Sequence, residues 1–242
     1  AATAYKHNLK EVQRLIEMAE DLGVRFMHFN YIPTGRAANR PDFDLSPDER
    51  LFVLRTIGGK LLDLHEKAMK EKRRTGKTSI VVGRFFSTCP QLAAVTRELA
   101  RERGRALTIS AHYAMMNANA AANFLGGCGA GRLYVGLDPN GDLKPCVFLP
   151  SSKDMVFGNI LRDDFEQVWD RSDVLWRLRS RENLRSYEMG KRLLGCGSCV
   201  EKYICGGCRA RSYYYFNKDL NGPDIGCIRN KDLWKMTSMN TV

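Results

Sequence analysis

The chain has 242 residues, 44% of them hydrophobic, which is enough to bury a core in one large domain or in a medium and a small one. It has no run of about 18 apolar residues and no secretory signal pattern, so we expect a cytoplasmic protein without a membrane partner. The formal charge of +11 would suit an anionic partner, but basic and acidic residues are intermixed, which favours solvated helix faces over a nucleic-acid surface.

The first part of the chain alternates between helical and extended patterns. Asn8 followed by Glu11 resembles a capping box, and apolar residues at helical spacing continue until Gly23. Residues 24–32 are apolar on both faces, as in a parallel strand covered on two sides, and a Pro-Thr-Gly-Arg loop follows at 33–36. We therefore expect a helix and then a buried strand.

The same alternation continues to residue 104. Residues 46–49, Ser-Pro-Asp-Glu, are a second capping pattern, and apolar residues continue that helix over 51–68. A strand is expected at 79–86 and a helix at 90–104. Strands and helices at this spacing predict a parallel α/β sheet, either doubly wound or a segment of a barrel. Two clear strands, with a third candidate at the N-terminus, are too few for a complete sheet, so we expect further sequence upstream.

The composition changes after residue 105. We interpret the Ala- and Asn-rich stretch 106–127 as a connector between a first domain at 1–105 and a second at 128–242. His112 and Tyr113 in this connector could donate or accept protons for a substrate, and a structural pair is the simpler interpretation.

The second domain starts with short strands. Apolar runs at 132–137 and 142–148 flank the turn at 138–141, Asp-Pro-Asn-Gly, which predicts a β-hairpin. A helical stretch is expected at roughly 163–181.

Eight cysteines in a chain without a secretory signal favour metal or redox chemistry over disulfides. Cys89 stands alone, and the other seven lie in the second domain: Cys128, Cys146, Cys196, Cys199, Cys205, Cys208 and Cys227. Two cysteines separated by two residues can bind one metal centre, because the turn between them frees backbone amides to hydrogen-bond the sulfurs. Seven thiols exceed one four-coordinate site, so two metal centres are implied.

The spacing resembles the SPASM extension of radical S-adenosylmethionine (radical SAM) enzymes, Cys-x9-15-Gly-x4-Cys, then Cys-x2-Cys-x5-Cys-x3-Cys, then a final Cys. Residues 157–160, with Phe165 and Trp169, resemble the family's Gly-Asn-Ile segment and the helix that follows it. The sequence departs from the pattern at one point. Cys205 and Cys208 have two residues between them where the family usually has three, which puts the placement of Cys208 in question.

This resemblance implies two auxiliary 4Fe-4S clusters. The first would be held by three cysteines, Cys128, Cys146 and Cys208. The second would be held by four, Cys196, Cys199, Cys205 and Cys227. The fourth iron of the first cluster could bind another side chain, water or substrate. Cys89 is one possible donor, and a small core cysteine is the simpler interpretation.

The N-terminal half resembles the later strand-helix units of a partial, TIM-like radical SAM barrel. The family's Cys-x3-Cys-x2-Cys motif occurs nowhere in the sequence. The resemblance therefore implies that S-adenosylmethionine and a third 4Fe-4S cluster belong to the full-length enzyme. Arg36 follows a strand's carboxyl end and could face S-adenosylmethionine or substrate, with a turn-stabilising role as the alternative.

The resemblance implies an enzyme that uses a 5'-deoxyadenosyl radical to abstract hydrogen from a peptide, a protein or a small-molecule cofactor precursor. Ferredoxin or flavodoxin would donate electrons, and the auxiliary clusters would transfer electrons or bind substrate. Two alternatives remain open. One is a non-catalytic iron-sulfur electron carrier or interaction module, and the other is a zinc-stabilised binding protein, although seven cysteines do not complete two four-ligand zinc sites without a further donor.

Overall fold

The computed structural model describes residues 1–77, 85–104 and 127–238. The first part of the chain contains a three-stranded parallel sheet in the order β1-β2-β3, formed by Ala2–Ala4, Phe26–Asn30 and Phe85–Ser87. Its helices are α1 (Val12–Asp21), α2 (Pro47–Thr75) and α3 (Leu92–Glu102), with short 3-10 helices η1 (Lys6–Glu11), η2 (Gly35–Ala37) and η3 (Pro41–Phe43). The expected α/β pattern is confirmed in this part.

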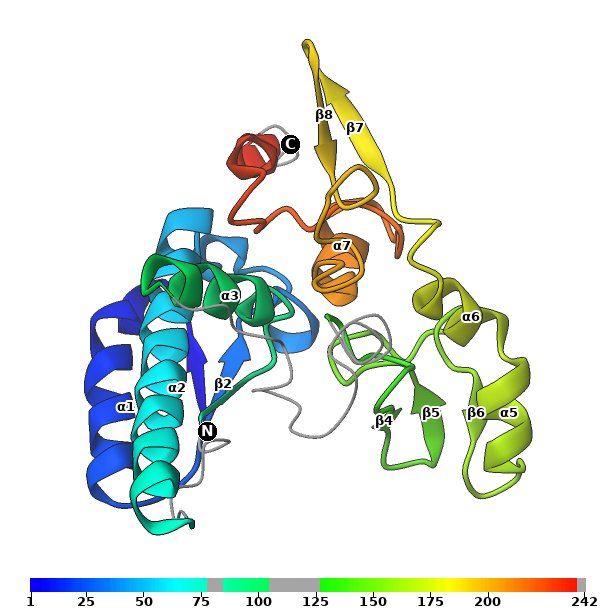
Figure 1. Ribbon diagram of the computed structural model, residues 1–242. Helices are drawn as coiled ribbons and strands as arrows, with labels where there is room; N and C mark the ends of the chain where they lie inside the picture. The colour runs from blue at the N-terminus through cyan, green and yellow to red at the C-terminus, as the bar shows by residue number, and fades with distance from the viewer. Residues whose placement is uncertain (78–84, 105–126, 239–242) are drawn as a thin grey trace.

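The three long helices pack against one face of this sheet (Figure 1). Ala4, Phe26 and Phe85 point from the strands into a core that all three helices share. On the other face, Met27 and Phe86 are each 40% exposed. We expected β2 to be covered on both sides. In the described residues its side chains instead alternate between buried and exposed or half-buried.

The two predicted capping boxes had different outcomes. Ser46 caps α2 as predicted, since its hydroxyl accepts the Glu49 N–H at 3.3 Å and the Glu49 carboxylate accepts the Ser46 N–H at 2.8 Å. The Asn8 prediction was wrong. Asn8 lies inside η1, where its side-chain oxygen accepts the N–H of Tyr5, three residues earlier, at 2.9 Å.

Residues 127–238 form a second, α+β part (Figure 1). Its elements are an antiparallel sheet of β4 (Gly136–Leu137), β5 (Asp142–Lys144) and β6 (Gly158–Asn159), helices α5 (Phe165–Arg171) and α6 (Asp173–Arg179), the hairpin of β7 (Ser186–Met189) and β8 (Arg192–Gly195), helix α7 (Arg209–Tyr215) and 3-10 helix η6 (Lys231–Ser238). The β4-β5 hairpin is as predicted. The β7-β8 hairpin, which Figure 1 shows projecting from this part, was not predicted.

The helical stretch expected at roughly 163–181 consists of two helices, α5 and α6. The backbone at Ser172 is extended, with φ −69° and ψ 120°, and its hydroxyl accepts the Leu175 N–H at 3.3 Å. Ser172 thus ends α5 and caps α6. Most of the expected strand at 79–86 and nearly all of the connector at 106–127, with His112 and Tyr113, lie outside the described residues.

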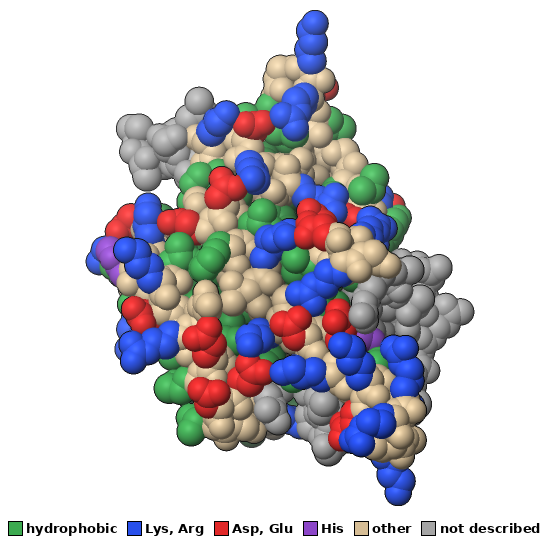
Figure 2. Space-filling view, turned by 60° about the vertical axis from the view of Figure 1, so that its left-hand side comes forward, with side chains coloured by type: hydrophobic (Ala, Val, Ile, Leu, Met, Phe, Trp, Pro, Cys, Tyr) green, Lys and Arg blue, Asp and Glu red, His purple; other side chains and the backbone are tan. Residues whose placement is uncertain are grey.

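No helix in the described part of the chain is long and apolar enough to cross a membrane. Figure 2 shows Lys and Arg side chains interspersed with Asp and Glu on the visible face. Ion pairs such as Arg55 with Glu102 (2.6 Å) and Arg103 with Asp63 (2.8 Å) join basic and acidic residues of neighbouring helices. This intermixing agrees with the interpretation of the charge as solvated helix faces.

Candidate metal centres

Four of the seven cysteines of the second part line a single cavity. They are Cys196, Cys199, Cys205 and Cys227. Cys196 follows β8, Cys199 and Cys205 flank a tight turn, and Cys227 lies in the loop before η6. We call this set the four-thiol group. The structure therefore brings together the cysteines that the family resemblance assigns to one cluster.

Every sulfur of the four-thiol group accepts a hydrogen bond. Backbone N–H groups of Glu201, Gly207 and Asn230 donate to Cys199, Cys205 and Cys227 respectively, each with a nitrogen-sulfur distance of 3.4 Å. The Arg209 guanidinium donates to Cys196 at 3.5 Å. Donors aimed at sulfur stabilise the thiolate form and tune the potential of a redox centre bound to it.

Burial disfavours thiolates in the four-thiol group. It raises the pKa of Cys227 to about 12, and it also raises the pKa of Cys196 and Cys205, where neighbouring cysteines add to the effect at Cys205. Four thiolates enclosed together therefore need a positive centre among them. A bound metal centre supplies that charge and deprotonates the thiols outright.

Cys128, Cys146 and Cys208 form a second set, the three-thiol group, inside an apolar core that includes Leu149 and Met155. Burial, followed by the proximity of Cys128, raises the pKa of Cys146 to about 11. Burial also raises the pKa of Cys208, with a further contribution from Cys128. The hairpin thus brings Cys128 and Cys146 near one another, as expected, and Cys208 joins them despite the shortened spacing before it.

Tyr134 lies beside the three-thiol group, and the sequence reasoning missed it. Its hydroxyl is 3.7 Å from Cys146 Sγ. Burial raises the pKa of Tyr134, and the three cysteines of the group add to that rise. The predicted hairpin could have revealed this contact, because Tyr134 lies just before β4 and Cys146 just after its partner strand β5.

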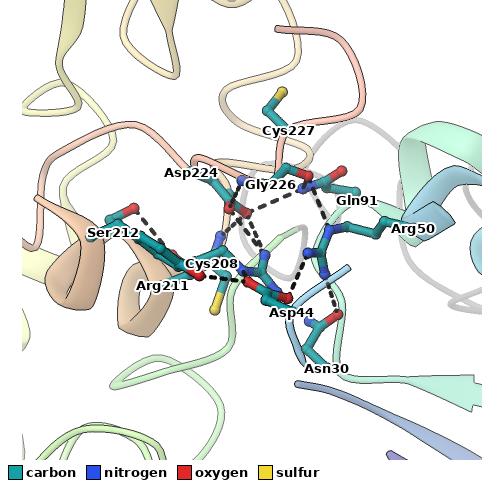
Figure 3. Close-up of polar contacts among 12 residues, drawn as sticks. Asn30, Asp44, Arg50, Gln91, Cys208, Arg211, Ser212, Asp224, Gly226 and Cys227 are labelled. Atoms are coloured by element: carbon teal, nitrogen blue, oxygen red, sulfur yellow. Dashed lines mark hydrogen bonds and ion pairs between the residues drawn. The ribbon is translucent and has the colours of Figure 1, made fainter. Parts of the chain in front are cut away.

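A network of buried charges and amides joins the two parts of the chain behind these thiols (Figure 3). We call it the buried polar seam, and its members are Asn30, Asp44, Arg50, Gln91, Arg211 and Asp224. Asp44 pairs with Arg50 at 2.9 Å and with Arg211 at 3.3 Å. Arg211 in turn pairs with Asp224 at 3.0 Å. All four of these side chains are almost fully buried.

Asp224 connects the seam to both thiol groups. It accepts the Cys208 N–H at 2.8 Å and the Gly226 N–H at 3.1 Å, next to Cys227. Burial opposes ionisation of Asp224, but Arg211 and Arg50 outweigh it and hold its pKa at about 2. Gly226 also accepts a hydrogen bond, because Arg50 Nε donates to its carbonyl at 3.1 Å. The seam therefore holds one cysteine of each group in place.

The remaining candidates lie apart from the two groups. Cys89 is buried in the core of the first part, and its N–H donates to Ser87 Oγ at 2.9 Å, as expected of a core cysteine. Arg36 is exposed on η2, and no described residue forms a hydrogen bond or ion pair with its side chain. Its role in binding cofactor or substrate stays a prediction.

Zinc needs about four donors converging on one point at roughly 2.3 Å for sulfur. Within the described ranges, no three His, Cys, Asp or Glu side chains converge on a single-ion site.

Comparison with known families finds an iron-sulfur cluster-binding domain in the second part of the chain. The model of SPASM, described as an iron-sulfur cluster-binding domain, matches residues 128–200. The matched segment contains Cys128, Cys146, Cys196 and Cys199, and the other three cysteines lie beyond it. With the relatives described next, this match makes the chain similar to radical SAM/SPASM proteins and agrees with the resemblance seen in the cysteine spacing.

Two named relatives extend this similarity beyond the matched domain. The chain is 28% identical over 214 residues to the AdoMet-dependent heme synthase of Methanosarcina barkeri, covering 87% of this chain and 50% of that protein. It is 30% identical over 161 residues to the mycofactocin maturase MftC of Mycobacterium ulcerans, covering 65% of this chain and 41% of that protein. The chain thus spans about half the length of the curated relatives it matches.

A solved structure, native anSMEcpe with bound AdoMet and Cp18Cys peptide, aligns with all of this chain and 57% of its own. The TM-score is 0.45 and the sequence identity 12%.

Proposed function

We propose that this chain is the auxiliary-cluster portion of a radical SAM/SPASM enzyme and that it binds two 4Fe-4S clusters. One cluster would be held by the four-thiol group and the other by the three-thiol group. The observation that carries the proposal is the four-thiol group, in which four sulfurs share one cavity and each accepts a hydrogen bond. Such clusters supply one-electron chemistry when bound.

The two thiol groups suit different tasks. The four-thiol group offers a complete ligand set, as an electron-transfer cluster needs. The three-thiol group offers three cysteines with the Tyr134 hydroxyl beside them, so one iron is left for a non-cysteine ligand. Substrate ligation would therefore fall to the three-thiol group, and electron relay to the four-thiol group.

The first part of the chain would supply the later units of a partial radical SAM barrel. Support comes from the parallel order of β1, β2 and β3 and from the packing of all three long helices on one face, since a doubly wound sheet would have helices on both. The exposed face with Met27 and Phe86 would then face the barrel interior. Arg36, beyond the carboxyl end of β2, would lie at the barrel mouth.

The whole enzyme would use S-adenosylmethionine and a third 4Fe-4S cluster to abstract hydrogen from a peptide, protein or cofactor precursor, with ferredoxin or flavodoxin as electron donor. Two relatives are named heme synthase and mycofactocin maturase, and these names support a peptide or cofactor precursor as the substrate of this protein. The full-length protein should therefore form 5'-deoxyadenosine from S-adenosylmethionine under reducing conditions. Failure to form it while both clusters are loaded would favour a non-catalytic electron carrier.

The cluster assignment is tested by metal content. The chain, purified or reconstituted without oxygen, should be brown, absorb near about 400 nm and contain about eight irons and eight sulfides. A colourless preparation that holds stoichiometric zinc and no iron would overturn the assignment in favour of the zinc-stabilised alternative.

A further inference from the structure

Arg209, the residue after Cys208, is fully buried without a carboxylate partner. Its side chain is 2% exposed, and it donates to the carbonyls of Leu220 (3.0 Å) and Gly222 (2.8 Å) and to Cys196 Sγ (3.5 Å). Among the described residues, no carboxylate forms an ion pair with it and nothing accepts a hydrogen bond from its Nε. A buried guanidinium in this state is costly unless an anion lies nearby.

Arg211, a member of the buried polar seam, lies two residues after Arg209 on α7 but has different partners. Arg211 has two carboxylates, Asp44 at 3.3 Å and Asp224 at 3.0 Å. The charge of Arg209 is faced chiefly by thiols instead. Burial opposes that charge, but Cys196 and Cys128, then Asp224 and Cys208, raise the pKa of Arg209. Those cysteines belong to both thiol groups.

Two glycines before Cys208 leave space for the side chains of Arg209 and Arg181. Gly207 has a φ of +70°, and a Cβ there would lie 2.7 Å from an Arg209 nitrogen and 3.0 Å from Cys196 Sγ. Gly206 has a φ of +63°, and a Cβ there would lie 1.7 Å from a nitrogen of Arg181, a second buried arginine. The diglycine between Cys205 and Cys208 therefore lets guanidinium groups approach the loop that joins the two thiol groups.

We propose that Arg209 is a buried cation shared by the two clusters, which offsets the negative charge of their thiolates and raises their reduction potentials. This inference rests on the proposed function, because only bound clusters hold the thiols as thiolates. Reduction adds an electron to an already anionic centre, so a fixed positive charge beside it stabilises the reduced form. Cys196 is the sulfur that Arg209 contacts, so the cluster of the four-thiol group should respond most.

The test is an EPR-monitored redox titration of the iron-loaded chain with Arg209→Gln, Arg209→Lys and the control Arg185→Gln. Arg185 lies in the same part of the chain but has a 61% exposed side chain. Arg209→Gln should lower the reduced-to-oxidised ratio at a fixed potential at least tenfold, which is about 59 mV for one electron. Arg209→Lys should stay within threefold of the unchanged protein, and so should Arg185→Gln.

The remaining outcomes of this titration also support or overturn the proposed role of Arg209. A fully loaded Arg209→Gln protein whose potentials match those of the unchanged protein would overturn the inference. If Arg209→Gln fails to retain iron, Arg209→Lys decides: recovery of iron and of the potentials supports a role for the charge, and loss of iron in both variants overturns it in favour of packing alone. An unchanged protein that binds no iron would instead contradict the proposed function.

Discussion

The two thiol groups differ in what surrounds their sulfurs. The four-thiol group is ringed by donors, with three backbone amides and one guanidinium aimed at sulfur. The three-thiol group lies among apolar side chains, where backbone hydrogen bonds from Phe148 and Arg211 reach Cys146 and Cys208 and the Tyr134 hydroxyl lies 3.7 Å from Cys146 Sγ. A positive charge stabilises an added electron, and Arg209 donates to Cys196, so the two clusters should have different potentials, with the four-thiol cluster easier to reduce.

The largest effect should come from breaking the seam that supports both groups. Asp224→Asn would leave Arg211 with one carboxylate and weaken the contacts at Cys208 and Gly226. We expect a loss of about 3–5 kcal/mol in unfolding free energy, as for other broken buried pairs, and loss of iron from both groups. Denaturant unfolding and iron analysis measure both quantities.

The matched control is Glu102→Gln, which neutralises a carboxylate paired with Arg55 at the surface, where side chains are 47% and 38% exposed. It should cost less than about 1 kcal/mol and leave iron unchanged. An Asp224→Asn protein as stable as this control would show that the seam does not support the thiol groups.

Cys227→Ala should remove the cluster of the four-thiol group and leave the other cluster in place. It removes one ligand of the four-thiol group alone, so iron should fall from about eight to about four per chain while the spectrum of the other cluster persists. Cys89→Ala is the control and should keep all the iron, because Cys89 lies in the core of the first part. Loss of four irons in Cys89→Ala would make that residue a ligand.

The pH dependence of unfolding tests whether His28, next to Arg50 and Arg211 of the seam, is buried as a neutral ring. Burial, with Arg50 and Arg211, lowers the pKa of His28 from 6.5 to about 3. The unfolded chain therefore takes up this proton first, so stability should fall as the pH drops below 6.5, by at most about 1.4 kcal/mol per unit. His28→Gln should show a shallower loss in thermal unfolding between pH 6.5 and 5. Equal slopes for the two proteins would mean that His28 is not buried as a neutral ring.

The smallest effect should be confined to the three-thiol group. Tyr134→Phe removes the hydroxyl 3.7 Å from Cys146 Sγ, and a hydrogen bond of this kind contributes about 1 kcal/mol. The reduced fraction of that cluster should fall severalfold at a fixed potential, with the other cluster unchanged. Tyr203→Phe, whose hydroxyl meets Glu182 at the surface, is the control. Equal shifts in both clusters would contradict a local role for Tyr134.

Features determined by neighbouring residues were predictable from the sequence. The Ser46 cap depends on Glu49, three residues away, and the β4-β5 hairpin depends on the turn between its own strands. The cysteine spacing is likewise a pattern along the chain, so the resemblance to the family could be recognised without a structure. In each case the groups that interact are close in sequence.

Features that depend on distant contacts were not predictable. The seam joins Asp44 to Arg211 and Gln91 to Asp224, pairs separated by more than a hundred residues. Nothing in the local sequence of Arg209 shows that it lacks a carboxylate partner among the described residues. Ser172 was missed for a different reason: its extended backbone breaks an otherwise helical pattern, and its hydroxyl serves as a cap.

The most direct test of two inorganic clusters is a crystal structure of the anaerobically loaded chain with anomalous diffraction recorded on both sides of the iron absorption edge. Two separate iron maxima are expected, one among Cys196, Cys199, Cys205 and Cys227 and the other beside Cys128, Cys146 and Cys208. A map with no iron at either place, or with one metal ion held by all the nearby sulfurs, would contradict the account.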